Sequence, residues 1–493
     1  MLNITSNNFL ASIIVAFIVF NMIAGCAVNP VSGKKQLALM SEADEIALGA
    51  QSDPQIIAEY GLYPDSSLQR FIREKGMAMA RISHRPNLNW QFRVLDSDVI
   101  NAFAVPGGYV YFTRGILAHM NNEAQFAGVL GHEIGHVTAR HSISQQSQGL
   151  LTQLGLMAAI IASPEVAQFA NELSQGAQLL TLKFGRDDES QSDELGVTYS
   201  SKVGYDAREM AKFFLTLQRS APKGSNELPE FMSTHPDPGN RYEKVTQLAN
   251  KYQKANNSTN MIVGQPNYFN QIAGIVHGTD PRQGYVENSI FYHPELKFQF
   301  STPAGWKFNN SPSSVMFAPP SGDGLAYLTL AKGNNAQEAA QAFQNQHKLQ
   351  ITDSRNTIIN GLQASLVMGD QVQQQNPQTG APGGTVRVVA AFIQHNGLVY
   401  ELIGAGSAQS FQNYLPAFQN LYSSFKTLTD PSKLNIKPER IAFVTAPRAS
   451  TFAQFLASQK IPDNRYDEYA LLNGLLLTDQ VTAGQKIKIL RRG

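Results

Sequence analysis

Cysteine is nearly absent from this chain of 493 residues, in which Cys26 is the single one. A single thiol excludes any disulfide within the chain. Charge is also scarce: charged residues make up 16% of the sequence, and the formal net charge is +1 with both signs interspersed. Such a chain offers no basic surface for nucleic acid, so we expect no nucleic-acid partner. The apolar content of 43% is that of a globular protein, and the length predicts about two to four domains.

Long apolar runs are rare as well, and the clearest one is Phe9–Gly25, which Cys26 follows directly. Small residues ahead of a lone cysteine, as in IAGC, resemble the cleavage site of a bacterial lipoprotein. We therefore predict a lipoprotein signal peptide over residues 1–25 and lipidation of Cys26. The run is close to membrane-spanning length, so a single-pass anchor is the alternative. Residues 1–8 contain no Lys or Arg, which departs from the usual positive start of a signal peptide.

The most informative stretch is NNEAQFAGVLGHEIGHVTARH, residues 121–141. Apolar residues recur in it at spacings of three and four, which predicts one amphipathic helix with Asn122 as its N-cap. His132 and His136 lie one turn apart on this helix, so both imidazoles can reach one metal ion. Glu133 lies about 100° round the helix from His132 and can act as a general base without being a ligand. This is the H-E-x-x-H arrangement of zinc hydrolases.

A third ligand is available downstream, in FGRDDESQSDELG, residues 184–196. Glu189 and Asp193 lie four residues apart there on a second predicted helix. We predict that Glu189 is the third zinc ligand and that Asp193 hydrogen-bonds a ligand imidazole and fixes its tautomer. The alternatives are a surface helix with scattered histidines and a solvated helix face for the two carboxylates. The first alternative predicts no third ligand at all.

Four segments in this order resemble metallopeptidase family forty-eight: NAFAVPGGYVYFTRG (101–115), EAQFAGVLGHEIGHVTARHS (123–142), ESQSD (189–193) and STHPDPGNR (233–241). The resemblance covers about residues 30–253. It implies a gluzincin endopeptidase with one Zn²⁺ per chain, held by His132, His136 and Glu189, and with Glu133 as the base. The transmembrane helices of the HtpX and prenyl-protease members are not evident in the sequence, which points to the periplasmic, BepA-like branch.

The last of these segments places His235 in a loop rich in proline and glycine, which the family resemblance puts at the active-site cleft. His235 either donates to the oxyanion or occupies the open zinc position at rest, and we count it among the catalytic residues. Arg241 is expected to pin this loop to a carboxylate rather than to touch substrate.

Three strand-like runs precede the first metal helix, and a Pro106–Gly108 turn joins the last two. We predict an edge strand beside the zinc, to which an extended peptide adds by main-chain hydrogen bonds. An ordinary sheet strand is the alternative. The residues of this strand are Asn101, Ala102, Phe103 and Ala104. Between the two metal helices, residues 149–162 are apolar but too few to span a bilayer. They form a core helix or, as the functional hypothesis, a lid over the cleft.

The predicted fold class is α+β. Residues 26–263 form the zinc metalloprotease domain, which we expect to be mainly helical with a small antiparallel sheet. Residues 285–430 mix strand-like and helical runs and form an α+β module of unknown role, whose FQFSTPAGW segment resembles PsbP-like domains. Residues 438–493 follow a β-α-α-β order and resemble a LysM domain, which either binds glycan or serves only as a packed structural unit.

These features predict a zinc endopeptidase in the periplasm, anchored to the outer membrane as a lipoprotein. Ala27 rather than Asp follows Cys26, which implies outer-membrane sorting within the lipoprotein resemblance. The expected partners are unfolded or misassembled envelope proteins as substrates, and peptidoglycan. One rival hypothesis is an envelope-assembly chaperone whose zinc site stays shut, and another is a structural lipoprotein associated with peptidoglycan. Zinc content and turnover of an unfolded protein separate the enzyme from both.

Overall fold

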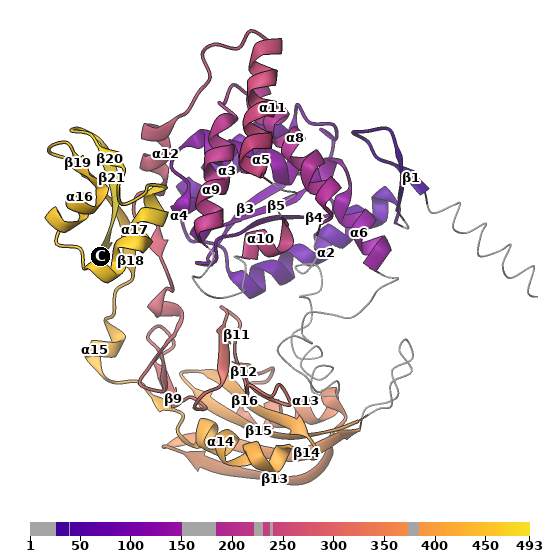
Figure 1. The fold of residues 1–493 in the computed structure, drawn as a ribbon. Helices are drawn as coiled ribbons and strands as arrows, with labels where there is room; N and C mark the ends of the chain where they lie inside the picture. Colours follow the sequence, from indigo (N-terminus) through magenta and orange to yellow (C-terminus); the bar gives the residue numbers. More distant parts are fainter. Residues whose placement is uncertain (1–25, 39, 150–183, 221–229, 237–239, 373–383) are drawn as a thin grey trace, which may run out of the picture.

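A computed structural model describes residues 26–38, 40–149, 184–220, 230–236, 240–372 and 384–493, and it is labelled as in Figure 1. The predicted signal peptide lies outside these residues, as does the predicted lid over residues 149–162 apart from Gly149. Figure 1 shows three units: a first unit that ends with α12, a central module below it, and a C-terminal unit beside the first. No helix in the described ranges is both long enough and apolar enough to cross a membrane.

The first unit is built around helix α5 (Glu123–Thr138), which is buried along its whole length. Gly131 of α5 meets Gly196 of α8 (Arg186–Lys202), where an added Cβ would lie 3.0 Å from the facing backbone. This close approach brings together α5 and α8, the two helices that carry the predicted zinc ligands. The remaining elements are β1 (Cys26–Val28), β2 (Lys35–Leu37), α2 (Glu42–Tyr60), α3 (Ser66–Ala80), β3 (Gln91–Leu95), β4 (Ala102–Val105), β5 (Tyr109–Thr113), α4 (Arg114–His119), α6 (His141–Gly149), α9 (Arg208–Arg219), α10 (Glu230–Thr234), α11 (Arg241–Ala255) and α12 (Gln265–Ile272).

Two details of this unit correct the sequence-based prediction. The small sheet has the order β3-β5-β4 and is mixed, because β3 runs parallel to β5 while only the β4–β5 hairpin is antiparallel. The helix expected over residues 121–141 ends at Thr138, since Arg140 has a positive φ of 58°. The side chain of Arg140 is held there by Glu45 and by the carbonyl of Met40. The chain therefore turns, and a new helix begins at His141.

The sheet of the first unit lies between two helices. Ile56 of α2 packs with Tyr109 and Tyr111 on one side, and Phe126 of α5 meets Phe112 at 5.0 Å between ring centroids. Strand β4 is at the end of the sheet, so its outer edge has no strand partner in the described part of the chain.

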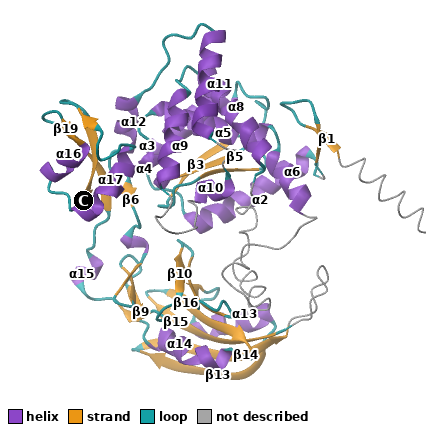
Figure 2. Ribbon diagram, in the orientation of Figure 1, coloured by secondary structure: helices purple, strands orange, loops and turns teal. Residues whose placement is uncertain are grey.

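The central module contains a seven-stranded antiparallel sheet of order β10-β11-β12-β16-β15-β14-β13, with a four-stranded sheet β17-β9-β8-β7 beside it. Helix α14 (Phe411–Ser423) packs with one buried cluster and α13 (Ala336–His347) with another (Figure 2). The α+β prediction fits this arrangement of helices and sheets. The strands are β7 (Tyr285–Glu287), β8 (Ile290–His293), β9 (Phe298–Ser301), β10 (Lys307–Asn310), β11 (Ser314–Ala318), β12 (Gly324–Leu330), β13 (Gln350–Ile359), β14 (Leu362–Val372), β15 (Thr385–His395), β16 (Leu398–Ser407) and β17 (Lys426–Thr427).

The C-terminal unit has the order β18 (Glu439–Thr445), α16 (Phe452–Ser458), α17 (Tyr466–Asn473) and β21 (Lys486–Arg492), with the short strands β19 (Ser450–Thr451) and β20 (Gln480–Val481) between them. Strand β18 also pairs with β6 (Val276–His277), which follows the first unit. The buried side chains of this unit belong to the same core as those of the first unit. The two units are therefore packed as one body.

Candidate metal centre

The two histidines of the motif converge on one point. His132 and His136 come from successive turns of α5, and their Nε2 atoms lie 3.0 Å apart. Both side chains are buried, with exposed fractions of 1% and 0%. Asp193 lies on α8, and its Oδ1 is 2.9 Å from His132 Nδ1. A carboxylate only accepts, so the His132 proton is on Nδ1 and its Nε2 lone pair faces His136.

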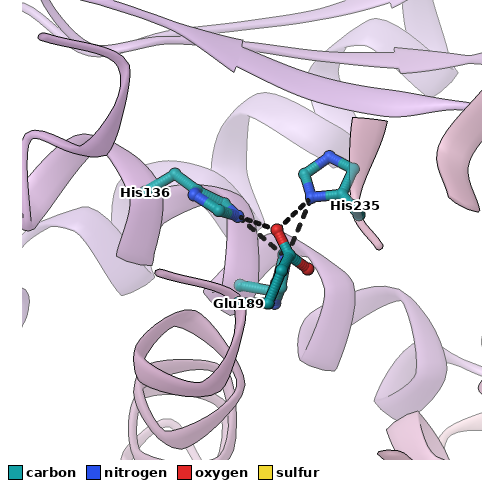
Figure 3. A group of neighbouring side chains, drawn as sticks. His136, Glu189 and His235 are labelled. Atoms are coloured by element: carbon teal, nitrogen blue, oxygen red, sulfur yellow. Dashed lines mark hydrogen bonds and ion pairs between the residues drawn. The ribbon is translucent and has the colours of Figure 1, made fainter. Parts of the chain in front are cut away.

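Glu189 and His235 complete the cluster. The Glu189 carboxylate lies 3.5 Å from His132 Nε2 and 3.3 Å from His136 Nε2. His235 Nδ1 lies 3.0 Å from Glu189 Oε1 and 3.3 Å from His132 Nε2. Figure 3 shows His136 and His235 pointing toward the Glu189 carboxylate. One donor atom from each of the four side chains lies within 4.8 Å of the others.

This donor set fits zinc. Tetrahedral zinc with bonds of about 2.0–2.1 Å places its ligand atoms about 3.3 Å apart, and the distances here are 3.0–3.5 Å. The His132 Nε2 lone pair faces His136 Nε2 at 3.0 Å and the Glu189 carboxylate at 3.5 Å. Glu189 Oε2 is buried with no hydrogen-bond partner among the described residues, although the Arg241 guanidinium lies 3.3 Å away. Lone pairs that face one another in a buried site are unfavourable unless a cation lies between them. Imidazole and carboxylate ligands suit zinc.

Glu133 lies beside the donors without joining them. It is fully buried, and neither carboxylate oxygen has a hydrogen-bond partner in the part of the chain that is described. Its nearest ionic neighbour is His235 Nε2, at 3.7 Å from Oε1. Burial raises the pKa of Glu133 to about 8, although His235 opposes the rise. A free, desolvated carboxylate next to a metal position is suited to general-base chemistry.

Arg241 supports this arrangement from the start of α11. Its guanidinium lies 2.5 and 3.0 Å from the two oxygens of Asp193 and 3.3 Å from Glu189 Oε2. Burial favours the protonated form of Asp193, but the charge of Arg241 and the hydrogen bond from His132 hold its pKa below the ordinary value. The structure thus places Arg241 against Asp193, the carboxylate that accepts from His132 Nδ1.

The predicted edge strand also lies near the centre. Asn101, which precedes β4, donates from Nδ2 to Glu230 Oε1 at 3.0 Å. Glu230 begins α10, the short helix that ends just before His235. The main chain from Ala102 to Ala104 pairs with β5 on one side only. Asn101 therefore links the start of the strand to the short helix that precedes His235.

Sequence reasoning missed several neighbours of the ligands. Phe184 stacks on His136 with ring centroids 3.9 Å apart, and Phe231 stacks on His235 at 4.5 Å. His141 Nδ1 lies 3.0 Å from His136 Nδ1. In the sequence Phe184 shortly precedes Glu189 and Phe231 shortly precedes His235, which was a weak signal that these two rings lie at the site. Nothing pointed to His141, because a continuous helix would have turned it away from His136.

Helix-borne histidines with a glutamate between them, and a carboxylate donor from a second helix, form the donor arrangement of gluzincin-type zinc metallopeptidases. Residues 66–249 match the model of Peptidase family M48, the family that the four segments resemble.

Two relatives illustrate the match. The β-barrel assembly-enhancing protease of Escherichia coli strain K12 is 29% identical over 242 residues, which is 48% of each chain. The mitochondrial metalloendopeptidase OMA1 of Arabidopsis thaliana is 28% identical over 193 residues, or 39% of this chain and 38% of that one. The chain thus spans about half the length of the first relative, at 48%. The solution structure of cyanobacterial PsbP from Synechocystis is similar at 12% identity, with a TM-score of 0.24, over 29% of this chain and 96% of that one.

Proposed function

We propose that this protein is a zinc-dependent endopeptidase of the bacterial cell envelope that cleaves misfolded or stalled envelope proteins. The observation that carries the proposal is the buried convergence of His132, His136 and Glu189 beside the unpartnered carboxylate of Glu133. The M48 domain and the similarity to a protease named for β-barrel assembly support the reaction and the compartment.

The side chains divide the work of peptide hydrolysis. Zinc, held by His132, His136 and Glu189, would polarise the scissile carbonyl and acidify water. Glu133 would accept the proton of the attacking water on a carboxylate oxygen and later deliver it to the leaving amine nitrogen. The unpaired edge of β4 would bind the substrate main chain as an added strand. This mode of binding reads backbone rather than side chains, so it favours extended, unfolded substrates.

His235 would keep the site closed at rest. Its Nδ1 lies within the donor cluster, where a fourth zinc ligand belongs. A catalytic zinc needs that position open. The same position favours the second candidate, an assembly chaperone whose metal site stays shut, and an activity assay distinguishes the two.

The compartment is a separate proposal. Cys26, which ends the sequence IAGC, supports a lipid anchor in the outer membrane, which would leave the enzyme in the periplasm. The β-α-α-β order of residues 438–493 supports a LysM-like unit, with peptidoglycan as its partner. Cys26→Ser should abolish lipid labelling, whereas an unmodified Cys26 on a retained apolar helix would favour the single-pass alternative. Muropeptide binding to the intact protein tests the glycan hypothesis.

Crosslinking in cells with Glu133→Gln as a substrate trap tests the function. We expect this variant to hold about one zinc per chain and to retain unfolded envelope proteins that the wild type degrades. Wild-type protein that binds zinc but never cleaves an unfolded protein, with His235 intact or replaced, would leave the chaperone candidate.

A further inference from the structure

A chain of hydrogen bonds joins the hairpin of β1 and β2 to the metal centre. His136 Nδ1 lies 3.0 Å from His141 Nδ1, and His141 Nε2 lies 2.9 Å from Gln191 Oε1. The same Gln191 oxygen accepts from Asn29 Nδ2 at 3.2 Å. Asn29 lies between β1 and β2, and both Asn29 and His141 are buried, with exposed fractions of 6% and 1%. No group in this chain of hydrogen bonds is a zinc ligand except His136.

The direction of this chain of hydrogen bonds is fixed at its outer end. The backbone amides of Val31 and Ser32 donate to Asn29 Oδ1 at 2.9 and 3.1 Å. A backbone N–H only donates, so the other end of the Asn29 amide is its NH₂ group, and Gln191 must present its carbonyl oxygen to it. That oxygen only accepts, so His141 carries a proton on Nε2.

The direction continues to the metal. A neutral imidazole protonated on Nε2 has its lone pair on Nδ1, so His141 Nδ1 accepts and His136 Nδ1 donates. The Nε2 lone pair of His136 is then free to face His132 and Glu189. Asp188 favours the same direction, because its Oδ1 lies 3.6 Å from His141 Nε2 and a carboxylate only accepts. The Ser192 hydroxyl, 3.3 Å from His141 Nδ1, can donate to that lone pair.

We propose that Asn29, Gln191 and His141 are positioning residues that select the metal-binding tautomer of His136. Through Asn29, the hairpin of β1 and β2 then strengthens zinc binding. The inference rests on the zinc site of the proposed function and adds a mode of regulation to it. Asn29 follows Cys26 by three residues. The segment next to the proposed lipid anchor is therefore also the segment that orients a zinc ligand.

The near-isosteric change Asn29→Asp tests this proposal in the full-length protein. One oxygen of the new carboxylate would still accept from the two backbone amides, but the other would turn Gln191 round to present its NH₂ group to His141. His141 Nε2 would then accept, and His136 would be protonated on Nε2. Because Asp188 resists this reversal, we expect about tenfold weaker zinc binding in chelator competition, and about hundredfold weaker when Asp188→Asn is added.

A matched variant separates orientation from charge. Ser32→Asp adds the same charge in the same turn at an exposed side chain, and its backbone amide still donates to Asn29 Oδ1. It should bind zinc as the wild type does. Imidazole ¹⁵N spectra of the metal-free chain should show His136 Nε2 bare in the wild type and protonated in Asn29→Asp.

Wild-type zinc affinity in Asn29→Asp, or an equal loss in Ser32→Asp, would overturn the proposal. These measurements use zinc affinity and ring protonation, so an inactive wild-type protein would contradict the proposed peptidase function without deciding this one.

Discussion

Two polar clusters in this protein are built in opposite ways. At the metal centre both oxygens of Glu133, one of Glu189 and Nε2 of His235 have no hydrogen-bond partner in the described residues. At the junction with the C-terminal unit, Lys488 donates to the carbonyls of Ala118 and Met120 at 2.7 and 2.9 Å. His277 pairs there with Glu468 at 3.0 Å.

The difference shows how to separate a reactive site from a structural one. Buried polar groups in proteins are nearly always paired, because an unpaired one costs free energy of folding. A cluster that pairs its groups with one another stabilises the fold. A cluster that keeps acceptors unpaired at the centre of the domain is explained by a ligand that the protein binds.

The largest expected contrast comes from neutralising one carboxylate in each cluster. Glu133→Gln should lower kcat for peptide cleavage by about 10²–10⁴-fold with zinc content unchanged, because it removes the base but no ligand. Glu468→Gln should leave kcat unchanged. Both are measured by hydrolysis of an unfolded protein together with metal analysis. Equal activity in Glu133→Gln and the wild type would contradict the role of Glu133.

In the same metal analysis, variants of the zinc ligands should lose zinc, whereas Glu133→Gln should keep it. His136→Ala and Glu189→Ala should each lower zinc occupancy, since each removes a donor atom. His119 is the matched control: it is buried at the junction, where its Nδ1 donates to the Gly115 carbonyl at 2.7 Å. His119→Ala should keep zinc and lose stability instead. Full zinc occupancy in Glu189→Ala would move the third ligand elsewhere.

His235 should give an effect of up to about a hundredfold, and its direction identifies its role. If His235 closes the site, His235→Ala opens the fourth zinc position and raises activity, perceptible as faster self-cleavage. We expect this result, because His235 Nδ1 lies among the donor atoms. A similar loss of kcat with zinc retained would assign His235 to the oxyanion. Unchanged kinetics and coordination would remove it from the site.

The metal centre was largely predictable because its information is local. The spacing of His132 and His136, and the helix that carries Glu189, follow from periodicity and motif. In the structure one donor atom from each lies within 4.8 Å of the others and of His235. The role of His141 was not predictable, since it depends on the left-handed turn at Arg140. That turn is set by contacts with Glu45 and Met40, nearly a hundred residues earlier in the chain.

The junction was not predictable for a related reason. Lys488 lies in a strand that ends with charged residues, and a lysine is ordinarily solvated. Only the two carbonyls at the end of α4, about 370 residues away, explain its full burial. Likewise, β3 pairs in parallel with β5 because it lies beside the β5 strand of the β4–β5 hairpin. No local pattern in the three strands specifies this choice.

Lys488 should dominate the stability of the junction. Burial lowers the pKa of its amine well below the ordinary value, and its side chain is fully buried. Lys488→Ala leaves two buried carbonyls without their donor and opens a cavity, so we expect a loss of about 2–4 kcal/mol in urea denaturation. Lys488→Met keeps most of the volume and isolates the hydrogen-bond contribution. Lys486→Ala, an exposed position on the same strand, is the control and should change little.

The smallest effect is a pH dependence at the same junction. Burial favours protonation of Glu468, but hydrogen bonds from His277 and Arg465 outweigh it and lower the pKa of Glu468 from 4.5 to about 2. A carboxylate whose folded pKa is depressed stabilises the fold above its unfolded pKa, and this contribution is lost as the pH falls through the folded value. The window is therefore about pH 4.5 down to about pH 2. Because Glu468 is partly exposed, we expect only about 0.5–1 kcal/mol.

The measurement is the difference between wild type and Glu468→Gln, since other carboxylates titrate in the same range. Above about pH 5 the wild type should melt at the higher temperature, and the difference should shrink as the pH falls through the window. Glu74→Gln, at an exposed position of α3, should show no such convergence. A difference in melting temperature that stays constant to about pH 3 would mean that Glu468 contributes shape rather than charge, and the junction would then rest on Lys488 and the shared core.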